Sequence, residues 1–264
     1  MRSKRRPRRA PRALRALRAL KRTPRAIRVG AAVAALVILS FAVNWAVQVA
    51  RKPAELLFPV SGVLDKTPAE TWRSYAAIFR ENATTVITPE FLAALAQVEG
   101  AGNPVAQTYW RWRLTAKPFE VYRPASSAVG MYQITDETFQ QEKRYCIHDH
   151  VAVADGPWHD LHSCWFNSLY LRVLPGDAAE MTSAYLDRQV ARVLEKQRVA
   201  AATPKQKQDL AAVIHLCGAG AGAAYAAHGF RVSARQHCGE HDLGRYLVRL
   251  DSMKRAFLRL AREH

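Results

Sequence analysis

The stretch TPEFLAALAQVEGAGNP, residues 88–104, decides the fold, because a capped apolar helix ends there in one carboxylate and a run of helix-breaking residues. Thr88 is a favourable N-cap, and Pro89 suits the first position of a helix. The glycines and proline of GAGNP end a helix. The pattern therefore predicts a helix from Thr88 to about Gly100, with Glu99 in its last turn.

Glu99 shares one helical face with apolar residues that precede it by eight, seven, four and three positions. These residues are Phe91, Leu92, Leu95 and Ala96. An acid on a buried stripe is costly unless it has a task. The helix C-terminus and the apolar neighbours both favour its protonated form, which a general acid for a glycosidic oxygen requires. The competing interpretation is an acid that extends into solvent or pairs with an arginine.

The charge of the chain is concentrated at its start. The 264 residues carry a formal charge of +17, and residues 1–28 hold 13 of the 39 Lys and Arg residues and no acid. The remaining 26 basic residues face 22 acidic ones, so residues beyond the arm form an ordinary, mildly basic domain. Because the basic arm adjoins an apolar segment, we expect it to set membrane orientation and contact anionic lipid rather than nucleic acid.

Residues 29–50 contain no charged side chain and are long enough to cross a bilayer as a helix. The basic excess upstream places the N-terminus in the cytoplasm and the rest of the chain outside. Ser40, Asn44 and Gln48 give this helix a mildly polar stripe, and Trp45 suits the far interface. A cleaved signal peptide is the competing interpretation. Residues 51–66, with two prolines and a glycine, predict a short linker before a domain at 67–264.

The four cysteines all follow the predicted span: Cys146, Cys164, Cys217 and Cys238. An even number in an oxidising compartment predicts two disulfides with three connectivities. We favour Cys146–Cys164 and Cys217–Cys238 because each closes a short loop. The spacing of His148, His150, His159 and His162 with the first pair resembles a metal site. Oxidised thiols argue against it, so we expect no metal and no cofactor.

The domain at 67–264 is predicted to be mainly helical. Helix starts are predicted by four capping patterns, at Thr67, Thr135, Asp177 and Thr203, and residues 242–263 predict an amphipathic terminal helix. Residues 107–124 alternate aromatic and basic side chains, which indicates an extended or hairpin segment lining a groove. We expect its partner to be a glycan or peptide carboxylates rather than nucleic acid.

A second segment, SSAVGMYQIT at 126–135, follows the first about 30 residues later. Together with QVEGAGNP it resembles the SLT family of lytic transglycosylases, whose fold is similar to goose-type lysozyme. That resemblance implies a catalytic role for Glu99 and substrate contact for the second motif and for a tyrosine in AYAAHG at 224–229. The implied substrate-binding residues are Gly130, Met131, Tyr132, Gln133 and Tyr225.

Three residues depart from the family pattern. Gly100 stands where serine is usual, Tyr132 replaces a methionine, and Ala226 replaces an asparagine. These departures bear on substrate preference and on the role of Tyr225, and they leave the place of Glu99 unchanged.

The resemblance implies a lytic transglycosylase anchored in the inner membrane with a periplasmic domain. Glu99 would cleave the β-1,4 bond between N-acetylmuramic acid and N-acetylglucosamine in peptidoglycan and give 1,6-anhydro ends. Two alternatives remain. One is a lysozyme-type hydrolase that uses Asp149, Asp155 or Asp160 as a second carboxylate. The other is a non-catalytic glycan-binding scaffold that recruits cell-envelope machinery.

Overall fold

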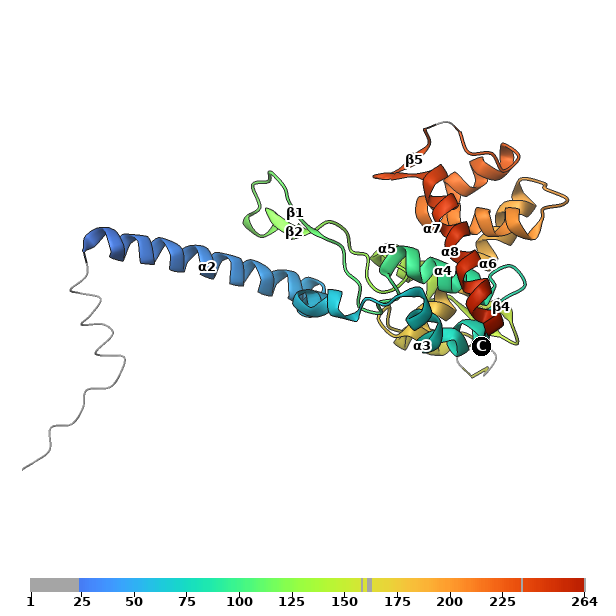
Figure 1. Ribbon diagram of the computed structural model, residues 1–264, viewed down its shortest axis with the longest axis horizontal. Helices are drawn as coiled ribbons and strands as arrows, with labels where there is room; N and C mark the ends of the chain where they lie inside the picture. Colours follow the sequence, from blue (N-terminus) through green and yellow to red (C-terminus); the bar gives the residue numbers. More distant parts are fainter. Residues whose placement is uncertain (1–23, 158, 161–162, 234, 264) are drawn as a thin grey trace, which may run out of the picture.

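A long helix projects from a helical body in the computed structural model, which describes residues 24–157, 159–160, 163–233 and 235–263 (Figure 1). This helix, α2 (Arg25–Arg51), contains the predicted membrane-spanning segment. Residues 1–23 of the predicted basic arm lie outside the described residues. The last residues of the arm are the first of α2, so the boundary expected at residue 28 falls inside a helix.

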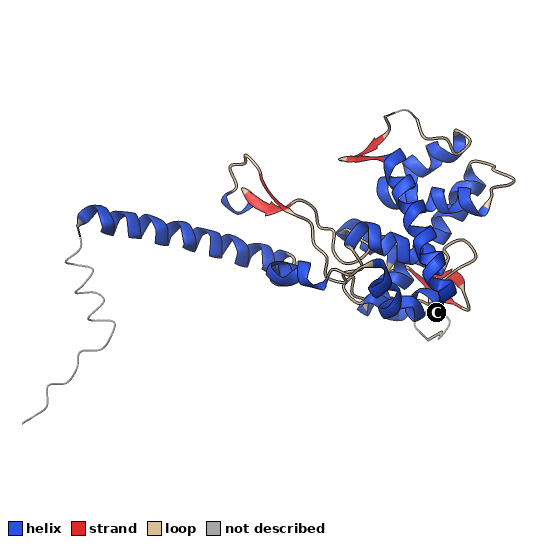
Figure 2. Ribbon diagram, in the orientation of Figure 1, coloured by secondary structure: helices blue, strands red, loops and turns tan. Residues whose placement is uncertain are grey.

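The body is built mainly from helices, with three short antiparallel hairpins at its periphery (Figure 2). The helices are α3 (Pro68–Glu81), α4 (Pro89–Gly100), α5 (Asp136–Glu142), α6 (Pro175–Lys196), α7 (Pro204–Ala227) and α8 (Leu243–Glu263). The hairpins pair β1 (Trp110–Trp112) with β2 (Tyr122–Pro124), β3 (Tyr145–His148) with β4 (Val151–Ala154), and β5 (His237–Cys238) with β6 (His241–Asp242). The predicted mainly α fold class is confirmed, and the predicted hairpin at 107–124 is present.

Threonine caps fix where several helices begin. Thr67 with Glu70 and Thr203 with Gln206 form reciprocal capping boxes, and the Thr135 hydroxyl accepts a bond from the third residue of α5. The cap predicted at Asp177 is wrong. Helix α6 begins earlier, at Pro175, and the Asp177 carboxylate instead accepts the Leu171 amide.

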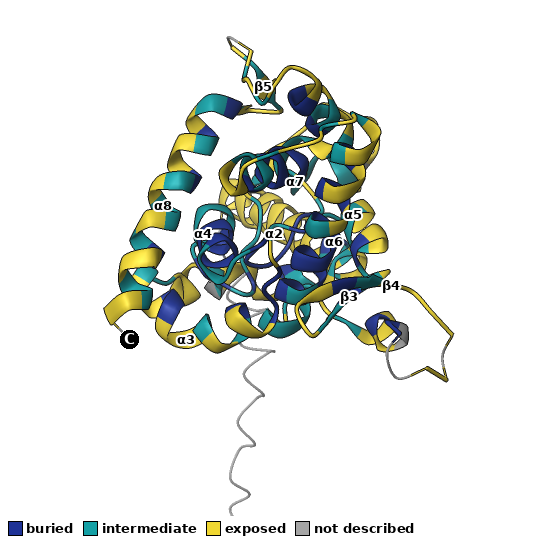
Figure 3. Ribbon diagram, turned by 90° about the vertical axis from the view of Figure 1, so that its right-hand side faces the viewer, coloured by how far each residue is buried: buried dark blue, intermediate teal, exposed yellow. Residues whose placement is uncertain are grey.

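Helix α4 lies at the centre of the body and packs chiefly against α8 and α3. The prediction gave it one buried face, but all six residues from Phe91 to Ala96 are buried (Figure 3). The reason is that neighbours cover α4 on several sides, so its alanines are in the core as well as its larger side chains. The two ends of α4 are less covered, and Glu99 is half-buried in the last turn.

Of the described helices, α2 and α7 are long and apolar enough to cross a membrane. Their surroundings differ. The apolar window of α7 is 44% buried in the body, whereas none of that of α2 is. Helix α7 also breaks at Gly218, whose φ of 82° interrupts its helical backbone.

The predicted linker is ordered rather than irregular. It contains a 3-10 segment, η1 (Pro53–Leu64), whose ends are bonded to the body. Lys52 donates to the Ala128 carbonyl at 2.9 Å, the Lys66 amide donates to the Ala101 carbonyl at 2.8 Å, and Gln97 donates to the Lys66 carbonyl at 2.8 Å. The chain between α2 and the body therefore has a defined path.

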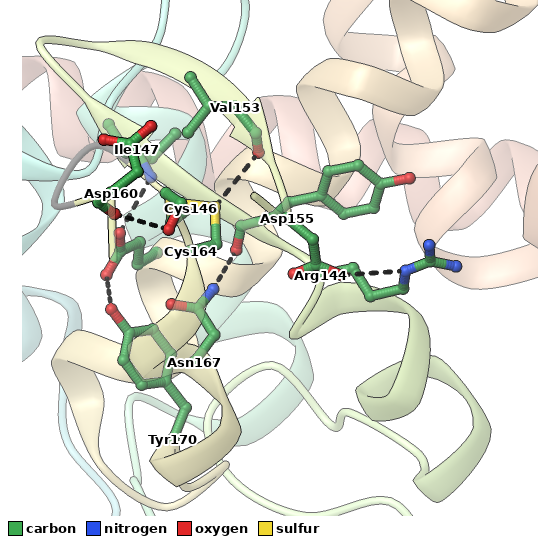
Figure 4. Close-up of a disulfide and its surroundings, with 12 residues drawn as sticks. Arg144, Cys146, Ile147, Val153, Asp155, Asp160, Cys164, Asn167 and Tyr170 are labelled. Atoms are coloured by element: carbon green, nitrogen blue, oxygen red, sulfur yellow. Dashed lines mark hydrogen bonds and ion pairs between the residues drawn. A yellow bond between two sulfur atoms is a disulfide. The ribbon is translucent and has the colours of Figure 1, made fainter. Parts of the chain in front are cut away.

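Both predicted disulfide pairings are present, with Cα separations of 5.5 Å for Cys146–Cys164 and 5.3 Å for Cys217–Cys238. The first joins β3 to the start of η3 (Trp165–Leu169) (Figure 4). Nearby, Glu180 accepts bonds from the Ile147 amide and the Tyr170 hydroxyl, so this loop is also bound to α6. The second ties the end of α7's first segment to β5, beside the start of α8.

Candidate active site

Glu99 is held from across the domain by a tyrosine of the terminal helix. The Tyr246 hydroxyl of α8 donates to Glu99 Oε1 at 2.5 Å. Tyr246 is 8% exposed, and burial, the Glu99 charge and this hydrogen bond raise its pKa well above the usual value. The phenol therefore stays neutral around neutral pH and remains a hydrogen-bond donor to the carboxylate.

His215 of α7 lies within the electrostatic reach of the same carboxylate. Desolvation lowers its pKa, while the Glu99 charge and a backbone hydrogen bond to Tyr132 oppose that shift. Because desolvation is the largest cause, the imidazole is neutral at neutral pH. Groups from α4, α7 and α8 thus converge on one carboxylate, as perturbed groups often do in functional sites.

Glu99 lines a polar cavity of about 390 Å³ at the end of α4. Residues from η1, from the loop after α4 and from α8 complete its wall: Ser61, Gly62, Asp65, Asn103, Ala106, Gln107 and Arg249. Arg249 also lines a second, larger cavity of about 690 Å³ along α8, together with Arg245 and Arg259. A basic surface therefore runs from the site of Glu99 along the terminal helix.

Asn103 of the first motif has a structural task in this wall. Its side-chain amide donates to the Ser61 carbonyl at 2.5 Å and to Asp65 Oδ1 at 2.8 Å, and its Oδ1 accepts the Val105 amide. It therefore ties η1 to the loop that follows Glu99, and it brings a second carboxylate, Asp65, into the same cavity.

The second motif packs directly beneath the end of α4. A Cβ added at Gly100 would lie 2.8 Å from the Met131 Cα, and one at Gly130, where φ is 81°, would lie 2.4 Å from the Arg172 carbonyl oxygen. Both glycines are required by these close backbone approaches. The segment after Gly130 is thereby fixed beside Glu99.

The family resemblance implied substrate contact for Met131 and Tyr132, but the structure does not place them at the surface. Met131 and Tyr132 are fully buried, so neither offers a face to a sugar in this structure. They serve the core below Glu99, because the close approach of Gly100 and Gly130 turns this segment inward. Gln133 is half-buried and donates its amide to the carbonyls of Gly130 and Ala106, at 2.9 and 3.2 Å. Its amide N–H groups stabilise the loop.

Tyr225 lies in the core, 5% exposed, with its ring 5.7 Å from that of Phe230, and burial raises its pKa to about 12. The tyrosine that contacts Glu99 is Tyr246, which motif comparison did not single out. The only indication of Tyr246 in the sequence was its position in the amphipathic pattern of the terminal helix. Tyr246 shares the apolar face of the amphipathic terminal helix with Leu250 and Phe257, and all three are buried.

The alternative residues lie elsewhere. His148, Asp149 and His150 line a separate cavity of about 400 Å³, and Asp155 forms an ion pair with Arg144. The described lining of the Glu99 cavity includes none of the three aspartates considered as second carboxylates. Within the described residues, which omit His162, no group of three or more His, Cys, Asp or Glu side chains is placed to hold a metal ion.

Residues 76–203 match the model of the transglycosylase SLT domain. The match includes Glu99 and the motif at 130–134 and ends before α7, so Tyr225 and Tyr246 lie outside it. No curated protein and no solved structure matches the chain. The fold is that of a lysozyme-like domain after an N-terminal apolar helix, and residues 76–203 of this chain belong to the transglycosylase SLT family.

Proposed function

We propose that this protein is a membrane-anchored lytic transglycosylase that cleaves peptidoglycan with Glu99 as its general acid and base. Membership of the SLT family supports a glycan-cleaving role of this type. The observation that carries the residue assignment is the half-buried Glu99 carboxyl, oriented by Tyr246 and facing a polar cavity. A cavity of this kind at a fixed carboxyl suits a sugar chain.

In the proposed reaction, Glu99 donates its proton to the oxygen that links N-acetylmuramic acid to N-acetylglucosamine. The substrate's acetamido group stabilises the developing positive charge at the anomeric carbon. The Glu99 carboxylate then accepts the proton of the C6 hydroxyl, which attacks the anomeric carbon and closes the 1,6-anhydro ring. Each proton that leaves Glu99 is returned, so the enzyme is regenerated without water.

The neighbouring groups orient this acid. Tyr246 holds Oε1 and so limits rotation of the carboxyl, and Arg249 places positive charge at the cavity, where the carboxylates of the stem peptides would bind. Gln133 stabilises the loop through its amide, and its carbonyl oxygen is the part of that side chain we assign to the glycan. Gly130 acts by permitting the close turn.

Digestion of purified peptidoglycan tests this assignment. We expect soluble muropeptides with 1,6-anhydro ends, identified by mass spectrometry. The matched control is Glu99→Gln, which keeps an oxygen to accept the Tyr246 bond and loses the acid. Release should fall by about 10²–10⁴-fold, with unchanged folding and glycan sedimentation. Full activity in Glu99→Gln would refute the role of Glu99.

A hydrolase is the second candidate, because Asp65 lines the same cavity as Glu99. A second carboxylate could activate a water and give reducing ends instead of anhydro ends. Asp65→Asn separates the two reactions. Loss of reducing-end products would support hydrolysis, whereas unchanged anhydro products would assign Asp65 only its bond to Asn103. Glycan binding without release by the wild-type chain would indicate the scaffold.

We assign α2 as a single membrane span with its N-terminus in the cytoplasm and the SLT domain in the periplasm, attached to the inner membrane. The charge asymmetry around α2 and the two disulfides support this placement. Carbonate-resistant fractionation of full-length protein, with protease added to spheroplasts, tests it. A chain that is released by carbonate, or is protected from protease in spheroplasts, would contradict this topology.

A further inference from the structure

The hairpin between the two SLT motifs lies against α2 rather than over the Glu99 cavity. Its strands pair Trp110 with Pro124, Arg111 with Arg123 and Trp112 with Tyr122, and the hairpin extends from the body in the direction of α2 (Figure 1). Of the segment predicted to line a substrate groove, Gln107 at its base lines the Glu99 cavity, whereas the strands of the hairpin do not. The aromatic and basic side chains of the hairpin therefore face a partner other than a glycan in the Glu99 cavity.

Two polar side chains of α2 donate hydrogen bonds to the backbone of the hairpin. Asn44 donates to the Tyr122 carbonyl at 2.8 Å, and Gln48 donates to the Phe119 carbonyl at 2.6 Å. These two residues of the polar stripe are the buried residues of α2. Beside them, the Phe41 ring meets the ring of Trp112 edge-on, at 6.1 Å between centroids. Polar side chains that would be costly in lipid thus have partners.

The length of α2 places this contact at a bilayer interface. Its 27 residues rise about 40 Å, which exceeds the hydrocarbon thickness of about 30 Å. If the uncharged run that begins at Val29 crosses the hydrocarbon, its first 20 or so residues end near Gln48, so Trp45 and Gln48 lie at the far boundary. The hairpin, which is bonded to Asn44 and Gln48, then lies at the boundary between hydrocarbon and headgroups, where its arginines can extend to the headgroups.

The free surface of the hairpin has the composition of an interfacial segment. Leu114 at its turn is fully exposed and Trp112 is 64% exposed. Residues 107–128 contain four basic residues and one acid, Glu120. Arg111 and Arg123 stand directly opposite each other across the strands, and Arg123 has an anionic neighbour, Glu120, at 3.9 Å. Glu120 balances only part of the charge of the four basic residues. Lipid phosphates would balance the remaining positive charge of the hairpin.

We propose that the hairpin at 107–128 inserts into the headgroup layer of the bilayer on the domain's side, with anionic phospholipid as its partner. Leu114 and the aromatic rings enter the acyl boundary, and the basic side chains bind lipid phosphates. This inference rests on the proposed membrane span, and it adds a second attachment point that neither the span nor the SLT motifs require.

The second attachment point is connected to the active site. Trp110 donates its indole N–H to Glu55 Oε2 at 3.0 Å, and Glu55 forms an ion pair with Lys52 at 2.8 Å. Gln107, at the base of the hairpin, donates to the Ala54 carbonyl. These bonds join the hairpin to η1, which forms part of the Glu99 cavity wall. A hairpin inserted in the headgroup layer would therefore orient the Glu99 cavity relative to the membrane.

A fluorophore at the hairpin turn tests the proposal in the full-length protein. All four native cysteines form disulfides, so Leu114→Cys offers one reactive thiol for a nitrobenzoxadiazole label. Val151→Cys, at an exposed residue of the β3–β4 hairpin, is the matched control. Both are reconstituted in vesicles of phosphatidylglycerol and phosphatidylcholine, and carbonate-resistant flotation confirms the span independently.

We expect blue-shifted emission, several-fold weaker quenching by iodide and stronger quenching by nitroxide-labelled lipids at residue 114 than at residue 151. Equal, water-like behaviour at both residues in protein that still floats would overturn the proposal and leave the span intact. Protection from iodide without quenching by nitroxide lipids would also overturn it, because a protein partner rather than lipid would then cover the turn. Failure to float would refute the span instead.

Discussion

Introducing a side chain at Gly100 tests how closely the two SLT motifs must approach. A serine Cβ there would lie 2.8 Å from the Met131 Cα, 3.0 Å from the Met131 carbonyl oxygen and 3.1 Å from the Gly130 carbonyl oxygen. All three are backbone atoms, so no rotamer change relieves the contact. Gly100→Ser must displace the motif segment or the end of α4, and with it Glu99.

The cost follows from overpacking. Forcing such a contact costs about 1–3 kcal/mol, and each kcal/mol lowers Tm by about 2–4 °C in a domain of this size. The variant should therefore melt about 2–12 °C below wild type. Because a displacement of about 1 Å at a catalytic group can cost about 10²-fold, we also expect muropeptide release to fall by up to that factor.

Gly220→Ser is the matched control, since a Cβ at this helical glycine of α7 meets nothing within 4 Å. It should melt at or slightly above the wild-type temperature. Far-UV circular dichroism in detergent gives Tm, and mass spectrometry of released muropeptides gives activity. A Gly100→Ser protein with the Tm and activity of Gly220→Ser would show that the motifs do not approach as described.

Three further predictions address other parts of the domain. Arg249→Ala should weaken binding to intact peptidoglycan more than to glycan stripped of its stem peptides, because Arg249, which lines both cavities, is assigned to the stem-peptide carboxylates. Sedimentation measures this, with Arg262→Ala, at an exposed residue, as the control. Equal loss on both substrates would contradict it. Replacing Cys217 and Cys238 with serine should cost about 3 kcal/mol in urea unfolding, from the loop that their 21-residue separation closes; unchanged stability would oppose that account. Burial raises the pKa of Glu142 to about 8, so the native state keeps a proton that the unfolded chain releases, and stability should fall as pH rises from about 5 to about 8. Glu142→Gln should remove that slope, as urea unfolding across the window would reveal, and a slope that persists would assign it to another group.

Local signals in the sequence predicted much of the fold. Threonine caps fixed the starts of α3, α4 and α7. These features depend on a few adjacent residues, so a single sequence carries them. The start of α6 was missed because Asp177, which resembles a cap, bonds instead to the amide of Leu171 in the preceding loop.

The site was harder to predict, because its neighbours come from distant parts of the chain. Glu99 was identified from its motif, but Tyr246 lies 147 residues away and only packing of α8 on α4 brings it there. Tyr132 was expected to contact substrate because the motif alone does not show which residues pack around it. The glycines on either side of the contact, Gly100 and Gly130, bring the segment close enough to bury it.

The bonded path of η1 has a consequence for where this protein can cut. A flexible linker of 12 residues would have a root-mean-square end-to-end distance of about 20 Å, so the domain could move over that range. Here hydrogen bonds from Lys52, Asn103 and Gln97 hold that segment against the domain, so the domain cannot move freely relative to α2. If α2 is the proposed membrane anchor, the Glu99 cavity is held at one fixed distance from the bilayer. Glycan strands at that distance could then be cleaved, whereas strands in outer layers of the wall could not.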